Sequence, residues 1–145
     1  MMPIVTATPN DLGSIQALLA ECSLPEQDLT STNLGAFLLL RRGEDLVGSV
    51  GLEIYDQDAL LRSLAVRTAQ RGQGLGKKLL STCESEATAR GVRTLYLLTT
   101  TVEKFFAARG YQRIERSTAP ETIQNTRQFH SICPSSAVCM RKELA

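Results

Sequence analysis

A glycine-rich, basic segment is the part of this sequence whose residue types and spacing are best suited to chemistry. It reads Gln-Arg-Gly-Gln-Gly-Leu-Gly-Lys-Lys over residues 70–78 and lies between an expected strand and an expected helix. Glycines let successive backbone N–H groups approach one anionic group, and a helix N-terminus adds unsatisfied donors and partial positive charge. Arg71, Lys77 and Lys78 supply mobile cations. The segment therefore predicts a binding site for a phosphate group.

Two common phosphate-binding patterns do not fit this segment. A Walker loop needs four residues before its Gly-Lys and then Ser or Thr, whereas Gly72 and Gly76 are separated by three and a second lysine follows. The dinucleotide fingerprint requires a glycine where this chain has a lysine. A third pattern, Arg/Gln-x-x-Gly-x-Gly/Ala, fits Arg71, Gly74 and Gly76 without a gap.

The hydrophobic pattern predicts the elements that must position this segment. Thr8 and Asp11 read as a capping box at the start of a helix that ends near Ser23, and Thr118 and Glu121 resemble a second box. Glycines at positions 48 and 51 suggest a bulge or a close neighbour. We expect further helices at 74–90 and around 102–110, and strands at 4–7, 36–40, 46–55, 59–66, 93–99, 111–116 and 136–141.

Composition excludes several classes of protein. The 145 residues suit one domain over 1–145, and 43% hydrophobic with 21% charged residues fits a compact soluble chain. No apolar run approaches the roughly 20 residues that span a bilayer, and the polar helix start that follows the first strand leads us to expect no secretory signal. A net charge of +1 argues against nucleic-acid binding. The four cysteines are interpreted as reduced thiols, which favours a cytoplasmic protein. Together these observations lead us to expect neither membrane nor nucleic-acid partners.

Charge is divided unevenly along the chain. Residues 1–60 hold two basic and nine acidic side chains, whereas residues 61–145 hold fourteen basic and six acidic ones. This is either ordinary surface charge or a means of attracting an anionic ligand to the second half.

The strand end Ser63-Leu64-Ala65-Val66, followed by the glycine-rich segment, resembles the GCN5-related N-acetyltransferase (GNAT) superfamily. Residues 105–111 look like that family's Phe-Tyr-x-x-x-Gly-Phe stretch. The resemblance implies an α/β (α+β) GNAT fold: a mixed, mostly antiparallel sheet of six to seven strands with helices on both faces. It also implies acetyl-CoA as cosubstrate, direct attack by an amine on the thioester carbonyl, and no metal.

The resemblance also assigns the cofactor contacts. Backbone groups of Leu64, Ala65 and Val66 would pair with the pantetheine arm, and a backbone N–H near Val66 would polarise the thioester carbonyl. The pyrophosphate would be held by the backbone of Arg71, Gly72, Gln73, Gly74, Leu75 and Gly76.

Two positions depart from the family pattern. Thr99 stands where Asn is frequent, and Phe106 stands where a Tyr often protonates the departing thiolate. Phe106 is still expected to contact the cofactor. The proton would come from water, Thr99 or Thr100, or from another donor such as Tyr96 or Tyr111.

Three residues are candidates for handling the acceptor. Arg62, with Ser63 beside it, could hold a carboxylate, phosphonate or arsenic oxyacid in a bidentate pair, or it could pair with Glu53. Glu53 could bind the acceptor ammonium or remove its proton through a water, or it could be a salt-bridged carboxylate. His130 is a base or a surface side chain.

Residues 61–64, 97–101 and 133–140 look like small GNAT proteins associated with arsenic resistance. Cys133 and Cys139 do not have the spacing of zinc ligands. Their two thiolates could bind trivalent arsenic, but a loop thiol and a core thiol in the final strand is the favoured interpretation. We therefore expect an N-acetyltransferase that acts on the primary amine of a small, amino-acid-like acceptor and that could form a homodimer. The alternatives are a non-catalytic acyl-CoA-binding sensor and a protein or peptide N-acetyltransferase.

Overall fold

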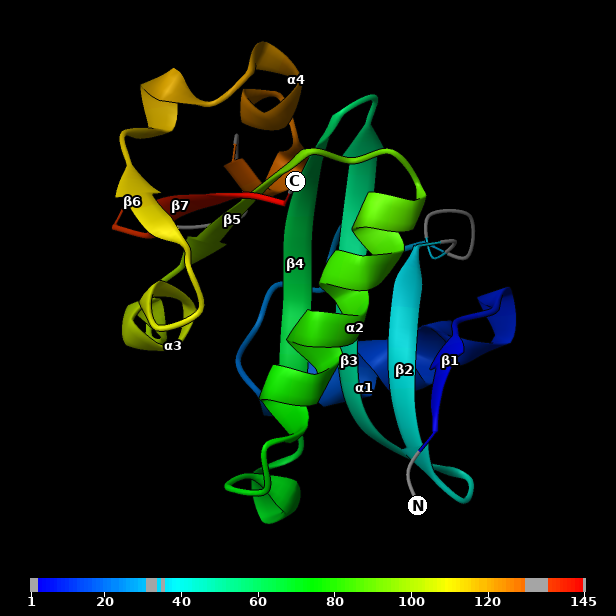
Figure 1. Cartoon of the computed structure of the whole chain (residues 1–145). Coiled ribbons are helices and arrows are strands. Elements are labelled where there is room, and N and C mark those ends of the chain that lie inside the picture. The colour runs from blue at the N-terminus through cyan, green and yellow to red at the C-terminus, as the bar shows by residue number, and fades with distance from the viewer. Residues whose placement is uncertain (1–2, 31–33, 35, 130–135, 145) are drawn as a thin grey trace. The chain divides into compact units, whose positions relative to one another are not determined.

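The computed structural model of the chain describes residues 3–30, 34, 36–129 and 136–144, and Figure 1 labels its elements. The α-helices are α1 (Leu12–Glu21), α2 (Leu75–Ala89), α3 (Glu103–Ala107) and α4 (Glu121–Gln124). The strands are β1 (Ile4–Thr6), β2 (Phe37–Arg42), β3 (Asp45–Tyr55), β4 (Asp58–Val66), β5 (Thr94–Thr99), β6 (Gln112–Ile114) and β7 (Val138–Glu143). The ends of the expected strands are shifted by no more than two residues.

The strands form one sheet in the order β1-β2-β3-β4-β5-β7-β6. Antiparallel pairing joins β1 to β2, β2 to β3, β5 to β7 and β7 to β6, whereas β4 and β5 run parallel. The expected mixed, mostly antiparallel sheet is therefore confirmed. The described helices include none long and apolar enough to cross a bilayer.

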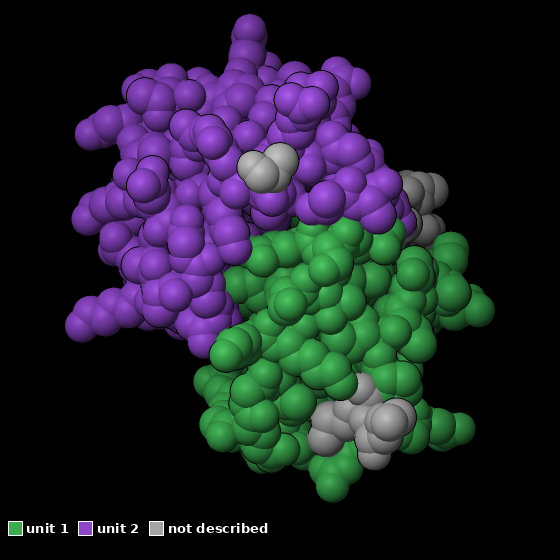
Figure 2. Space-filling model, viewed as in Figure 1, with its two compact units in different colours: residues 1–52, 62–86 green, residues 53–61, 87–145 purple. Residues whose placement is uncertain are grey.

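The chain forms two compact units, which Figure 2 shows in different colours. Unit 1 comprises residues 1–52 and 62–86, and unit 2 comprises residues 53–61 and 87–145. Strands β3 and β4 and helix α2 contribute residues to both units. The expectation of a single domain over 1–145 stays a prediction.

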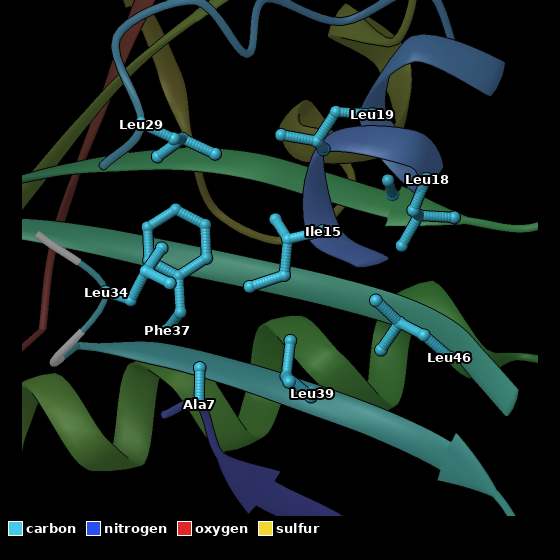
Figure 3. Packing of buried hydrophobic residues seen from close by; sticks show 10 residues of the cluster. Ala7, Ile15, Leu18, Leu19, Leu29, Leu34, Phe37, Leu39 and Leu46 are labelled. Carbon is cyan, nitrogen blue, oxygen red and sulfur yellow. The ribbon is translucent and has the colours of Figure 1, made fainter. Parts of the chain in front are cut away.

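Unit 1 is built around an apolar cluster between α1 and one face of the sheet (Figure 3). Ile15, Leu18 and Leu19 project from α1 at helical spacing and are fully buried against side chains of the sheet, among them Phe37 and Leu39 of β2. Helix α2 covers the face of the sheet opposite to α1 (Figure 1). Cys83 of α2 is fully buried.

Two glycines of β3 allow close approach, as expected. A Cβ at Gly48 would lie 2.8 Å from Leu79 of α2 and 2.9 Å from the Ala65 carbonyl oxygen. A Cβ at Gly51 would lie 2.5 Å from ring atoms of Phe37. The sheet therefore packs closely on both faces only because these positions lack side chains.

The first expected capping box is present and the second is not. The Thr8 amide donates to the Asp11 carboxylate at 2.7 Å, before the chain enters α1. Thr118 instead ends a 3-10 turn and donates its hydroxyl to the Glu115 carbonyl at 2.7 Å, and α4 begins after Pro120. The prediction of a second box is wrong because the N-cap is Pro120, which has no backbone N–H to donate to the Glu side chain.

In unit 2, α4 and Phe129 pack against one face of β4, β5 and β7. Its buried cluster comprises Leu60, Tyr96, Ala119, Ile123, Phe129 and Cys139. The parallel pairing between β4 and β5 joins Asp58–Leu60 to Thr94–Tyr96.

Candidate active site

The glycine-rich segment forms an exposed loop that leads directly into α2. Gly72 and Gly74 have φ angles of +84° and +78°, which residues with a Cβ rarely adopt. A Cβ at either position would meet no atom within 4 Å. These glycines are therefore required for the backbone conformation and not for packing.

Several backbone N–H groups of this loop donate no hydrogen bond to the described residues. Within the described part of the chain, the N–H groups of residues 72–77 have no acceptor, and the next amide, that of Lys78, donates to the Gly74 carbonyl at 3.1 Å. Lys77 and Lys78 are exposed beside them. Successive amides at a helix N-terminus suit a pyrophosphate, because they combine hydrogen-bond donation with the positive end of the helix dipole.

Arg71 is anchored, which corrects the expectation of a mobile cation at this position. Its Nε donates to the Val66 carbonyl at 3.0 Å, and its Nη2 lies 3.4 Å from the sulfur of Cys22. The Cys22 thiol also contacts the Val66 carbonyl at 3.6 Å. Arg71 therefore ties the start of the loop to the end of β4.

Strand β4 contains a kink immediately before the residues assigned to pantetheine. Ser63 has a φ angle of +59°, a left-handed conformation that costs an L-residue about 1 kcal/mol. The Ser49 hydroxyl donates to the Ser63 carbonyl at 2.8 Å. Leu64 and Val66 are half-buried and Ala65 is buried.

Arg62 is 3% exposed and is paired with Asp28, a residue that the sequence analysis did not single out. Its Nη1 and Nη2 contact both carboxylate oxygens of Asp28, the second at 2.7 Å, and its Nε donates to the Ser63 hydroxyl at 3.1 Å. The guanidinium carbon lies 5.9 Å from the centre of the Phe37 ring. No local signal identifies Asp28, because it lies 34 positions from Arg62 in a polar stretch. A substrate-binding role for Arg62 and Ser63 stays a prediction.

Glu53 is half-buried near the end of β3 and accepts a hydrogen bond from the Tyr55 hydroxyl at 2.8 Å. The two residues are two positions apart on a strand, so they share a face of the sheet. Tyr55 therefore orients the Glu53 carboxylate, which is the candidate base from the sequence analysis.

Thr99 and Phe106 are both buried within unit 2. The Thr99 hydroxyl accepts from the Val102 amide at 3.2 Å, where the chain turns toward α3. The Phe106 ring makes edge contacts with Phe105 and Tyr111, with centroid distances of 5.3 Å in each case.

Tyr96, a candidate proton donor, is also buried. Burial, followed by the nearby Asp58 carboxylate, raises the pKa of Tyr96.

The described cysteines include two buried thiols. Burial, followed by the neighbouring Glu84 and Glu86, raises the pKa of Cys83 to about 12. Burial raises the pKa of Cys139 to about 11, which keeps this thiol protonated at neutral pH. The proposed partner Cys133 and the candidate base His130 lie outside the described residues. Among the described residues, no group of three or more His, Cys, Asp or Glu side chains could hold a metal ion.

Comparison with known proteins gives consistent matches. The model of the acetyltransferase (GNAT) family matches residues 11–115. An amino-acid acetyltransferase of Azotobacter vinelandii is 33% identical over 116 residues, which cover 73% of this chain and 26% of the relative. One of Ralstonia nicotianae is 28% identical over 144 residues, which cover 94% of this chain and 31% of the relative. The chain thus spans about a quarter to a third of these relatives.

Solved structures share the fold. N-acetylglutamate synthase from Neisseria gonorrhoeae, complexed with coenzyme A and N-acetyl-glutamate, superposes on 100% of this chain with a TM-score of 0.86 and 22% identity. The match covers 35% of that protein. Rv2747 from Mycobacterium tuberculosis, in complex with CoA and NLQ, matches with a TM-score of 0.83 and 18% identity, and 99% of each chain is covered.

Proposed function

Because the chain belongs to the acetyltransferase (GNAT) family, we propose that it transfers an acetyl group from acetyl-CoA to the amino group of an amino acid. The observation that carries this proposal is the row of unpartnered amides at residues 72–77, at the start of α2. These amides, with Gly72 and Gly74 in left-handed conformations, fit the pyrophosphate of acetyl-CoA. Leu64, Ala65 and Val66 pair with its pantetheine arm.

Catalysis proceeds by direct attack. Glu53, oriented by Tyr55, takes a proton from the acceptor ammonium through a water, and the free amine then attacks the thioester carbonyl. A backbone N–H near Val66 stabilises the developing oxyanion. The attacking nitrogen loses its second proton to water, the carbon–sulfur bond breaks as the amide forms, and the CoA thiolate takes a proton from water or from a donor such as Thr99.

The acceptor is proposed from the relatives. Two of them are amino-acid acetyltransferases, and one structural neighbour was crystallised with N-acetyl-glutamate. The association with arsenic resistance rests only on the resemblance in residues 61–64, 97–101 and 133–140 and remains a prediction. A cytoplasmic location and a homodimer likewise remain predictions.

The experiment is a free-thiol release assay with acetyl-CoA and a panel of amino acids, their phosphono and arseno analogues, polyamines and peptides. We expect release with an α-amino acid. Gly72→Ala should raise the KM for acetyl-CoA about tenfold, because alanine strains the loop. Gly91→Ala is the matched control. Gly91 also has a positive φ angle, of +86°, and a Cβ there would meet no atom within 4 Å, but this residue lies after α2. Thiol release that is absent throughout the panel, or equal effects of the two substitutions, would contradict the proposal.

A non-catalytic acyl-CoA sensor is the second candidate, and Phe106 is the observation that favours it. A phenyl ring cannot protonate a thiolate, and this ring is 4% exposed within unit 2. A sensor would bind acetyl-CoA in calorimetry and release no thiol with any amine.

A further inference from the structure

We propose that Asp28, Arg62 and Ser49 are positioning residues that hold the left-handed kink at Ser63 and thereby aim the backbone of β4 at the reacting thioester. This inference rests on the proposed acetyltransferase function, because residues 64–66 are assigned to acetyl-CoA there. It adds Asp28 and Ser49, to which the proposed function gives no role, and it has Arg62 act through the conformation of the strand instead of through a contact with the acceptor.

The left-handed conformation of Ser63 is unusual because this residue lies inside a strand. Among the described residues, left-handed φ angles in residues other than glycine occur at Ser23, Asp56 and Ser63. Ser23 follows the end of α1, and Asp56 lies in the turn between β3 and β4, where such angles are expected. Ser63 alone lies inside a strand, so its surroundings must impose the conformation.

Two side chains hold Ser63 directly. Ser49, which is fully buried, donates its hydroxyl to the Ser63 carbonyl at 2.8 Å. The Arg62 Nε donates to the Ser63 hydroxyl at 3.1 Å. The carbonyl and the side chain of one residue are therefore both fixed, which restricts rotation about its backbone bonds.

Asp28 and Phe37 in turn fix the guanidinium of Arg62. Asp28 is 6% exposed and contacts Nη1 and Nη2 with its two oxygens, so the planar groups face each other with little competition from water. The ring of Phe37 lies 5.9 Å from the guanidinium carbon. The absence of a side chain at Gly51 makes room for this ring.

The consequence for catalysis follows from strand geometry. Successive N–H groups of a regular strand point to opposite edges, and a left-handed residue changes the direction of those that follow. Ser63 immediately precedes Leu64–Val66, whose backbone is assigned to the pantetheine arm and the carbonyl oxygen. An oxyanion donor must lie about 2.7–3.1 Å from the oxygen, so a relaxed kink should lower kcat. Acetyl-CoA affinity should change much less than kcat, because residues 72–77 still hold the pyrophosphate when the kink relaxes.

Ser49→Ala is the principal test, because it removes one hydroxyl and leaves the buried ion pair intact. We expect kcat to fall about tenfold and the KM for acetyl-CoA to change less than about twofold, since removing an oxyanion donor outright costs about 100- to 1,000-fold. Thr126→Ala is the matched control: its buried hydroxyl donates to the Ile123 carbonyl at 2.7 Å, outside the network. Thr126→Ala should leave kcat unchanged. Asp28→Asn should reproduce the selective loss of kcat.

Glycine at position 63 separates positioning from general stability. Glycine adopts the left-handed conformation without a Cβ penalty, so the kink then depends less on Ser49. Within a Ser63→Gly background, Ser49→Ala should lower kcat less than about twofold. Additive effects, equal losses in Ser49→Ala and Thr126→Ala, or a rise in KM without a fall in kcat would overturn the inference.

The positioning network can also be tested if the protein proves to have no acetyltransferase activity. If the wild-type protein releases no thiol with any acceptor, the same cycle of Ser49→Ala and Ser63→Gly is measured by urea unfolding. A smaller effect of Ser49→Ala in the Ser63→Gly background then supports the network, and additive effects contradict it.

Discussion

At the scale of single residues, the buried pair of Arg62 and Asp28 gives a prediction about stability. Arg62→Met or Asp28→Leu alone should lower the free energy of unfolding by about 3–5 kcal/mol, because each removes one member of a buried ion pair. The double variant should lose less than either single variant. Urea unfolding measures all three, and additive losses would contradict the prediction.

The exposed pair of Arg67 and Glu21 is the control for this measurement. Its side chains are 40% and 39% exposed, against 1% and 5% in the buried pair. Glu21→Ala should therefore cost only about 0.5 kcal/mol, because water already screens this interaction.

Cys83 gives a prediction about alkaline pH. Its pKa is about 12 in the folded protein, against an ordinary value of 9.0, because burial disfavours the thiolate. The protonated thiol therefore contributes stability that is fully present below pH 9 and is lost as the pH rises from 9 to 12. The loss is at most about 1.4 kcal/mol per pH unit. Unfolding of Cys83→Ala at pH 8, 9.5 and 11 should show a shallower decline than wild type, and parallel declines would contradict this.

The chemistry of single residues was partly predictable from the sequence. The spacing of Gly72, Gly74 and Gly76 predicts an anion site because a loop needs only its own backbone to present successive amides. The anchoring of Arg71 to Val66 and Cys22 could not be predicted, because Cys22 lies 49 positions away.

At the scale of elements, Gly51 determines how closely Phe37 packs on β3. Gly51→Ala should lower the free energy of unfolding by about 1–3 kcal/mol, because its Cβ would lie 2.5 Å from ring atoms of a buried side chain. Gly13→Ala, in α1 and with no atom within 4 Å of its Cβ, should raise it by about 0.5–1 kcal/mol through helix propensity. Thermal unfolding distinguishes them, and a shift in the same direction for both would contradict the packing argument.

The elements were predicted well because their signals are local. Helix α1 follows from the capping box at Thr8 and its apolar spacing, and the hairpin of β3 and β4 follows from two apolar runs around residues 56–58. The kink at Ser63 had no such signal. Serine carries no preference for the left-handed conformation, and the groups that impose it come from β3 and from the segment before β2.

At the scale of the whole molecule, binding of CoA should stabilise the folded chain. At a CoA concentration of 100 times Kd, the free energy of unfolding should rise by about 2.7 kcal/mol. Hydrogen exchange of the amides at residues 72–77 should slow on binding, because they gain acceptors. Gly72→Ala should need more CoA for the same shift. Unchanged exchange in this segment would contradict the assigned site.

From the sequence alone we predicted the order of the elements and a glycine-rich loop suited to an anion, and the family resemblance implied the mixed sheet. The elements and the loop depend on residues that are neighbours in the chain, so periodicity, capping and glycine spacing indicate them. Only the tertiary structure decided which groups surround β4: Asp28 on Arg62, Ser49 on Ser63, and Phe37 over Gly51. The physical reason is that buried charges and strained backbone require partners, and folding brings those partners from distant parts of the chain.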